Sequence, residues 1–236
     1  MELKPETFLI GVIDFFSIML PGAVVTYLAK ADVAPVLFGK VFPEYTSETE
    51  GWAVFLFSSY LLGHFVFLIG SKFDDAYDCI RKASEGKRSS PVCGWLGKTL
   101  LPKDAHLAVE KIIEIKRKYL PEVDGKFIIN AFQWAKARLT LQCPGALQEV
   151  HRFEADSKFF RSLLVVLLIL AIALLFKGKL LLSLFCLALS WLSFWRYVER
   201  RFKATEQAYR YIITLEACPL IPASHITPRA KQEGET

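Results

Sequence analysis

The residues in this sequence best placed to do chemistry are two ionisable side chains, Asp14 and His64, which interrupt apolar segments. A charge inside a bilayer costs about 2.5–3.5 kcal/mol on insertion scales, so such a residue usually turns inward to a partner or water. If the two segments cross a membrane in opposite directions, both residues lie at a depth of about 10 Å. We predict an ion pair, a proton site or a ring of acids around a pore. The alternative is that Asp14 caps a helix at the headgroups.

A second group consists of small, weakly polar side chains in the apolar run 180–195. Their spacing of +3, +4 and +3 places them on one seam of a helix. Such a seam usually allows close packing between membrane helices, and in an oligomer it could also line a narrow pore; we favour packing. Ser59 and Gly63 form a similar small pair, again interpreted as packing. The seam residues are Ser183, Cys186, Ser190 and Ser193.

Basic residues between 111 and 138 are candidates for binding a nucleotide, an oligonucleotide or a cytosolic protein. Glu110 and Glu114 lower the net positive charge of this stretch, and no glycine-rich phosphate loop accompanies the basic residues. Mixed charges along a helix usually indicate a solvated face, which is the interpretation we favour. The candidates are Lys111, Lys116, Arg117, Lys118, Lys126, Lys136 and Arg138.

Catalysis has little support, because the histidines are scattered and no H-E-x-x-H, G-x-S-x-G or Walker sequence is present. We therefore predict no enzyme activity, no cofactor and no metal. The cysteines contain no C-x-x-C pair, and most fall in segments predicted to face the cytosol, where thiols stay reduced. Neither a disulfide framework nor a zinc site is expected among Cys79, Cys93, Cys143, Cys186 and Cys218.

The elements that must position these residues begin with two charge-free runs, Ser162–Phe176 and Leu180–Trp195, separated by Lys177-Gly178-Lys179. So short a connector predicts a hairpin of two antiparallel membrane helices. Each run is about 24 Å long, so flanking aromatic residues must complete the span. Without a helix breaker, we expect the third span to begin soon after Pro144-Gly145 and the fourth to continue to about Ala217.

Two further spans precede this hairpin. Thr7–Ala29 is apolar, with Pro21 and Gly22 as a predicted kink or hinge. A signal peptide is the competing interpretation, but the segment lacks a basic start and contains an acid. Trp52–Ile69 is the second span.

The polar middle region is predicted to be largely helical. Residues 72–82 should prolong the second span, and residues 83–102 read as an exposed loop. Asp104 is a plausible N-cap for an amphipathic helix through Leu120, and another helix should cover about 125–142.

Composition agrees with a mixed architecture, because 53% of residues are hydrophobic while 22% are charged. We predict an all-α polytopic membrane protein with four transmembrane helices and a cytosolic helical bundle, formed by the 72–160 insertion and the C-terminal helix.

Between Lys72 and Arg161 there are 17 Lys and Arg, against two each at 30–51 and 177–179, which predicts that both termini face the cytosol. The regions are 1–71 (two spans and an outer loop at 30–51), 72–160 (cytosolic), 161–196 (hairpin) and 197–236 (cytosolic helix and disordered tail).

Two runs carry a resemblance: Asp14-Phe-Phe-Ser-Ile-Met-Leu-Pro21-Gly22, and Arg152-Phe-Glu-Ala-Asp-Ser-Lys-Phe-Phe-Arg161-Ser leading into a span. They resemble small bacterial four-span membrane proteins of antiphage defence operons, such as Hailong-type and CRISPR-accessory membrane effectors. The resemblance implies a homo-oligomer in the bacterial inner membrane that permeabilises the bilayer when it is released or is triggered by a nucleic-acid or nucleotide signal. It assigns no residue a role.

The expected function is therefore an oligomeric inner-membrane channel or depolarising effector, gated through its cytosolic helices by a ligand or partner. The alternative is a non-conducting membrane anchor that recruits a cytosolic protein or a nucleic-acid-bound partner. A transporter ranks third, because the chain lacks the signature of an inverted repeat.

Overall fold

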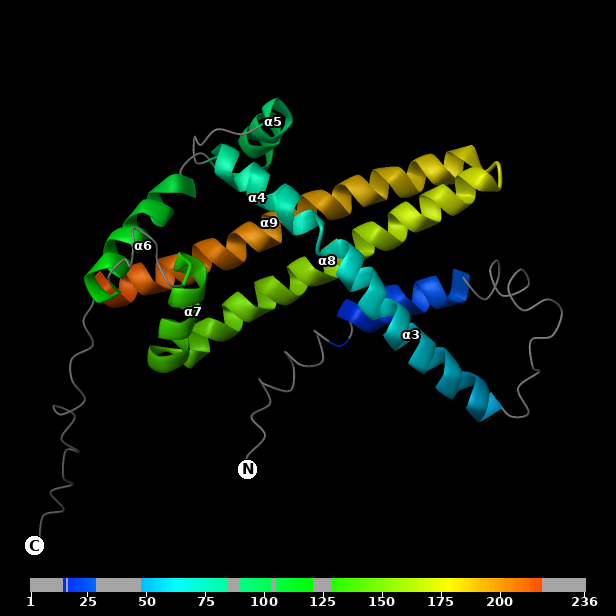
Figure 1. Ribbon diagram of the computed structural model, residues 1–236, viewed down its shortest axis with the longest axis horizontal. Helices are drawn as coiled ribbons and strands as arrows, with labels where there is room; N and C mark the ends of the chain where they lie inside the picture. The colour runs from blue at the N-terminus through cyan, green and yellow to red at the C-terminus, as the bar shows by residue number, and fades with distance from the viewer. Residues whose placement is uncertain are drawn as a thin grey trace, which may run out of the picture.

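The computed structural model describes residue 15 and residues 17–28, 48–84, 90–102, 105–120 and 129–217 (Figure 1). The predictions for Asp14, Asp104 and Lys126 lie outside these residues. Within them the chain is helical without strands, as predicted, and three helices are long and apolar enough to cross a membrane. The described part of the first predicted span is a shorter apolar helix, Ser17–Leu28, so four spans remain a proposal.

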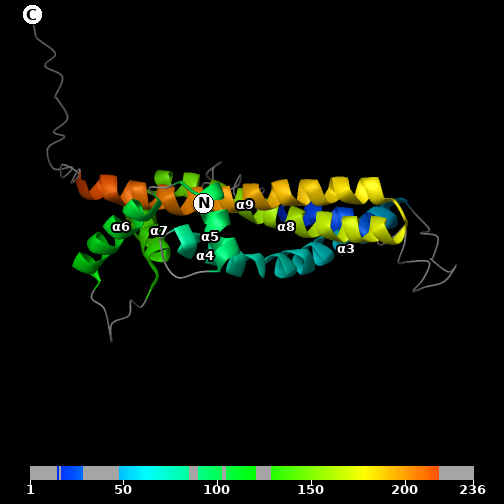
Figure 2. The same ribbon diagram turned by 90° about the horizontal axis from the view of Figure 1, so that it is seen from above.

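The fold is organised around two long antiparallel helices, α8 (Pro144–Phe176) and α9 (Leu180–Ala217). They are joined by a tight turn in which Gly178 has a φ of 70°, a left-handed conformation that glycine adopts without steric cost. Figures 1 and 2 show the two helices side by side along the long axis of the molecule. The predicted antiparallel helix pair and its continuation to Ala217 are confirmed, and both helices are long and apolar enough to cross a membrane.

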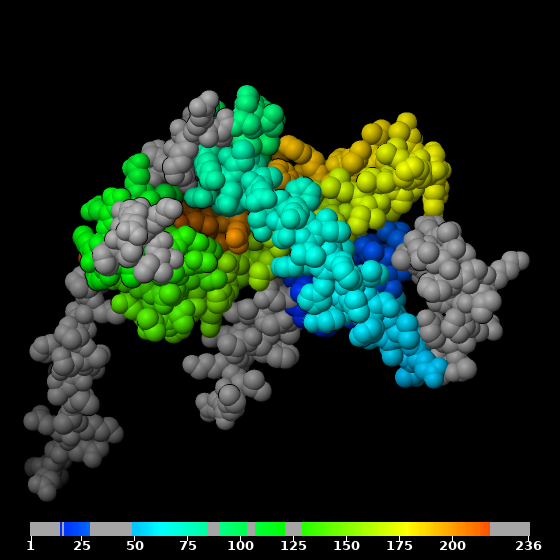
Figure 3. Space-filling model, viewed as in Figure 1, coloured from blue at the N-terminus to red at the C-terminus, as the bar shows by residue number. Residues whose placement is uncertain are grey.

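The helix α3 (Glu48–Gly70) lies against α8 near the middle of the hairpin, and its N-terminal end projects away from it (Figures 1 and 3). Val66 of α3 packs with Val165 and Val166 of α8, and Val25 of the Ser17–Leu28 helix joins them. The predicted continuation beyond the second span exists as α4 (Phe73–Ser84), separated from α3 by a turn at Ser71 and Lys72.

A polar bundle occupies the end of the hairpin opposite Gly178 (Figures 1 and 2). There α6 (Ala105–Tyr119) and α7 (Ala131–Gln142) pack on the polar halves of α8 and α9. Ile112, Trp134 and Ile212 belong to the shared core. The helix predicted up to Leu120 is confirmed, whereas α7 begins at Ala131, later than predicted, because Asn130 caps it by accepting a hydrogen bond from the Gln133 backbone NH.

The prediction of an exposed loop over 83–102 is wrong, because α5 (Pro91–Leu100) occupies half of it. Ser90 is its N-cap and Pro91 its first residue, a combination that suits a helix start. Gly97, which read as a loop residue, instead allows close packing: a Cβ there would lie 2.9 Å from the Ile80 carbonyl oxygen of α4.

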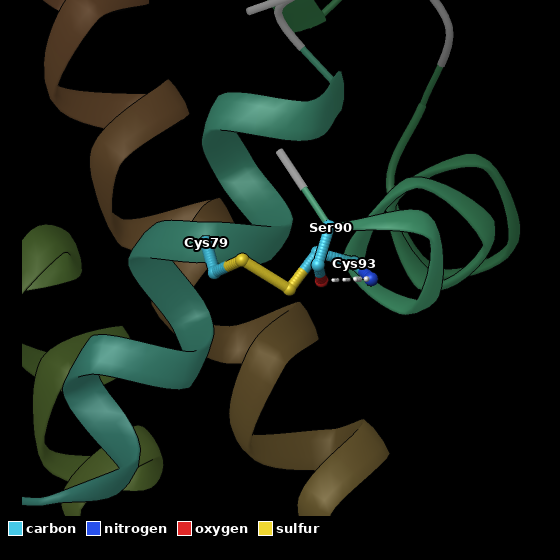
Figure 4. The surroundings of a disulfide bond; sticks show 3 residues. All are labelled: Cys79, Ser90 and Cys93. Carbon is cyan, nitrogen blue, oxygen red and sulfur yellow. Dashed lines mark hydrogen bonds between the residues drawn. A yellow bond between two sulfur atoms is a disulfide. The ribbon is translucent and has the colours of Figure 1, made fainter. Parts of the chain in front are cut away.

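The structure also corrects the expectation for the cysteines. A disulfide joins Cys79 of α4 to Cys93 of α5, whose Cα atoms are 5.9 Å apart (Figure 4). Sequence spacing did not indicate this pair, because packing of α4 against α5 brings it together. Cys143 and Cys186 are free.

The disulfide and the positive-charge bias favour opposite compartments, since disulfides persist in oxidising surroundings. The cytosolic orientation that the sequence predicts rests on basic residues that flank the spans, and it would place both cysteines in reducing surroundings. We therefore expect Cys79 and Cys93 to be thiols in the cell and to form the disulfide when purified protein is oxidised in air. Rapid alkylation of intact cells followed by mass spectrometry distinguishes the states, with Cys79→Ser as control. A bond already present at quenching would reverse the predicted topology.

Candidate functional site

The best-defined polar cluster joins three helices where the apolar runs end. The Arg161 Nη1 atom of α8 lies 2.5 Å from Asp74 Oδ2 at the start of α4. The Tyr197 hydroxyl of α9 donates a hydrogen bond to the other oxygen, Asp74 Oδ1, at 2.6 Å. One carboxylate thus binds both helices of the hairpin, and its position in the first turn of α4 also suits the helix dipole.

Arg161 is unusually enclosed for an arginine, with 6% of its surface exposed. Its guanidinium carbon lies 4.6 Å from the centroid of the Phe67 ring, a cation–π arrangement. Its Nε atom is buried and has no hydrogen-bond partner among the described residues. Gly70 makes room for it, because a Cβ there would lie 3.3 Å from Arg161 Cγ.

Aromatic and aliphatic side chains surround this cluster on its polar side. Tyr197 is fully buried, and its ring lies 6.2 Å from that of Tyr77. Leu100 of α5 and Phe202 of α9 belong to the same core, which therefore connects α4, α5 and α9. A charge-assisted hydrogen bond shielded from solvent is stronger than one in water, so this cluster can hold the long apolar helices and the polar helices in one arrangement.

His64 does not lie in the interior of the chain. It is exposed on α3, and its described ring contact is with Tyr60, 4.6 Å away on the same helix. The neighbouring apolar side chains Leu61, Phe65 and Leu68 are exposed as well. The pairing predicted with Asp14 lies outside the described residues.

The small pair in α3 and the predicted hinge meet at a close helix crossing. A Cβ on Gly22 would lie 1.8 Å from the Ser59 carbonyl oxygen, and one on Gly63 would lie 2.2 Å from the Ile18 carbonyl oxygen. The packing interpretation of Ser59 and Gly63 therefore has direct support. Pro21 and Gly22 lie inside the Ser17–Leu28 helix, and their use as a hinge remains a prediction.

The seam on α9 faces α8. The Ser183 hydroxyl donates a hydrogen bond to the Ala171 carbonyl oxygen of α8 at 2.8 Å. In this arrangement the seam supports packing inside one chain, and access to a pore would require the hairpin to open. All four members are buried: Ser183, Cys186, Ser190 and Ser193.

The basic residues do not converge on one surface. Lys116 is fully buried and donates to the Ile129 carbonyl oxygen, which holds Ile129 against α6. Lys136 of α7 pairs with Glu154 of α8 at 2.6 Å. Lys111, Arg117 and Lys118 are exposed on α6. Of these, Lys111 pairs with Glu114 on the same helix.

Arg138 links α7 to the end of α9 through Glu216, at 2.9 Å. Its guanidinium also lies 4.4 Å from the Tyr119 ring centroid, and the Tyr119 hydroxyl donates to the same carboxylate. Burial opposes ionisation of Glu216, but the hydrogen bond from Tyr119 and the charge of Arg138 hold its pKa below the usual range. Arg138 and Lys136 thus hold the bundle together, a use that the sequence analysis did not predict.

Asp74, Arg161 and Tyr197 were not among the predicted site residues. The sequence indicates Asp74 and Arg161 by position: an acid lies a few residues after one apolar run and an arginine directly precedes the next. If the two runs cross a membrane, the polar insertion between them places both residues at the same face, where pairing is favourable.

Comparison with known proteins finds no matching family model, no matching curated protein and no matching solved structure.

Proposed function

We propose that the protein is a membrane effector that assembles into a homo-oligomeric channel, gated by its polar helical bundle. The observation that carries the proposal is the exposure of His64 on α3, inside an apolar helix long enough to cross a membrane. An ionisable side chain facing lipid is costly, so membrane proteins direct such residues to a partner or to water. A second copy, or a hydrated path between copies, provides either environment.

Gating is supported by the continuity of the hairpin. The helices α8 and α9 run without interruption from the apolar section into the bundle, over about 50 Å and 57 Å. Bending a continuous helix pair is harder than bending a loop. The Asp74–Arg161–Tyr197 cluster ties α4 to the same pair. A ligand or protein that moves α6 or α7 would therefore displace the membrane helices.

Oligomerisation is supported by the location of the polar side chains. The single chain buries its small polar seam, whereas His64 is exposed on α3. A conducting path must then form between copies, with His64 and Asp14 as the candidates to face it. We place the oligomer in a bacterial inner membrane with both termini cytosolic; a role in antiphage defence follows from the resemblance alone.

A second candidate is a non-conducting anchor that recruits a cytosolic partner. The buried seam favours it, because Ser183 and its neighbours serve packing within one chain. The bundle would then act only as a docking platform on the membrane.

Expression in bacteria with a voltage-sensitive dye separates the two candidates. We expect induction of the wild-type protein to depolarise the membrane, because an abundant gated channel populates its open state at a minor level without its trigger. His64→Phe should reduce depolarisation at least tenfold, because the ring keeps the apolar face but cannot ionise or hydrogen-bond. Phe57→Leu, two turns away on the same face of α3, is the control and should depolarise normally. Intact potential with wild-type protein inserted at normal levels would favour the anchor.

A further inference from the structure

An open groove of about 650 Å³ lies between α8 and α9 on the apolar section of the hairpin. Its floor is aliphatic and aromatic, and polar residues lie at one end. On α8 it is lined by Phe160, Leu163 and Leu167, and on α9 by Leu189, Leu192, Ser193, Trp195, Arg196 and Glu199.

The order of these residues along the helices sets the direction of the groove. Leu167 and Leu189 lie inside the two charge-free runs, whereas Phe160 and Arg196 lie at their ends. If the runs cross a bilayer, the groove extends from the hydrocarbon region to the headgroup level, and Trp195 lies at the interface, where tryptophan is favoured.

Arg196 supplies a positive charge at the polar end of the groove. Its Nη1 atom lies 2.6 Å from Glu199 Oε2, and Lys203 binds the other carboxylate oxygen at 2.7 Å. Burial opposes ionisation of Glu199, but hydrogen bonds from Lys203 and Arg196 hold its pKa below the usual range. The three side chains carry a net charge of +1, and Glu199 fixes both cations beside the groove.

We propose that this groove binds an anionic phospholipid, with one acyl chain along Leu163, Leu167 and Leu189 and the phosphate on Arg196. Charge complementarity identifies the occupant. A guanidinium has five N–H donors and binds phosphate well, and Glu199 accepts from one of its nitrogens. Basic pockets beside membrane helices recognise anionic headgroups in the same way. The proposal requires a bilayer around the hairpin and does not depend on conduction.

Native mass spectrometry of the full chain, released from nanodiscs of phosphatidylglycerol or of phosphatidylcholine, tests the proposal. We expect at least fivefold more retained lipid per chain from phosphatidylglycerol. Arg196→Gln should abolish this preference, and Arg196→Lys should keep part of it. The matched control is Arg210→Gln, which removes an exposed arginine of α9 that pairs with Glu206 away from the groove.

A second variant tests whether the groove binds the acyl chain, independently of the headgroup charge. Leu167→Trp should fill the groove and lower retention of both lipids, whereas Leu181→Trp, at an exposed position outside the groove, should not. Equal retention of the two lipids by the wild-type protein would overturn the proposal. So would the same lipid preference in Arg196→Gln and Arg210→Gln, or a protein dimer that retains no lipid.

Discussion

Replacing Gly63 with alanine is expected to destabilise the protein by about 3 kcal/mol, the upper end of the range for overpacking. The reason is backbone contact: the new Cβ would lie 2.2 Å from the Ile18 carbonyl oxygen, and no side-chain rotation relieves that clash. The Ser17–Leu28 helix must then separate from α3. Thermal unfolding in detergent, together with folded yield, measures the effect.

The control for this prediction is Gly94→Ala in α5, where a Cβ meets nothing within 4 Å. Alanine is a better helix former than glycine by about 1 kcal/mol, so the control should raise the melting temperature. Gly22→Ala should behave like Gly63→Ala, because its Cβ would meet Ser59. A rise in melting temperature for Gly63→Ala would contradict the close helix crossing.

Removal of the Asp74 carboxylate is expected to cost about 3 kcal/mol of stability. Arg161 is enclosed and would keep an unpaired charge, the situation in which breaking a buried pair costs most. We expect the lower end of that range, because the Asp74 side chain is 39% exposed and solvent screens part of the interaction. Asp74→Ala should lower the melting temperature and also detach α4 from the hairpin, detected as faster amide hydrogen exchange in α4.

Two variants make this prediction specific. Asp75→Ala removes the neighbouring exposed acid in the same first turn of α4 and should have little effect. The double variant Asp74→Ala with Arg161→Met should recover part of the lost stability, because no charge is then left unpaired. Equal effects of Asp74→Ala and Asp75→Ala would show that the cluster does not hold the helices together.

The hairpin could be predicted because its signals are local. The charge-free runs, the Lys177-Gly178-Lys179 connector and the lack of a breaker before Ala217 each act through neighbouring residues. The structure confirms both helices. α5 was missed because Gly97 read as a loop residue, while the start signal of Ser90 and Pro91 received too little weight.

Partner choice could not be predicted, because it depends on which helices meet. Asp74, Arg161 and Tyr197 come from separate parts of the chain, and Arg138 and Glu216 are 78 residues apart. The basic residues of α7 were interpreted as a solvated face, because the acidic side chains that pair with them lie on other helices, α8 and α9. The Cys79–Cys93 pair was missed for the same reason, since only the packing of α4 on α5 brings the sulfur atoms together.

Ion flux through purified protein in sealed liposomes tests the central claim most directly. The wild-type chain, reconstituted at several protein-to-lipid ratios, should dissipate a potassium gradient even without a trigger, because a gated channel populates its open state at a minor level. The rate should rise more steeply than the protein concentration, because copies must assemble. His64→Phe should reduce the flux at least tenfold, and Phe57→Leu should not. Liposomes that stay sealed at every ratio, although they contain folded wild-type protein, would contradict the channel and leave the protein as an anchor.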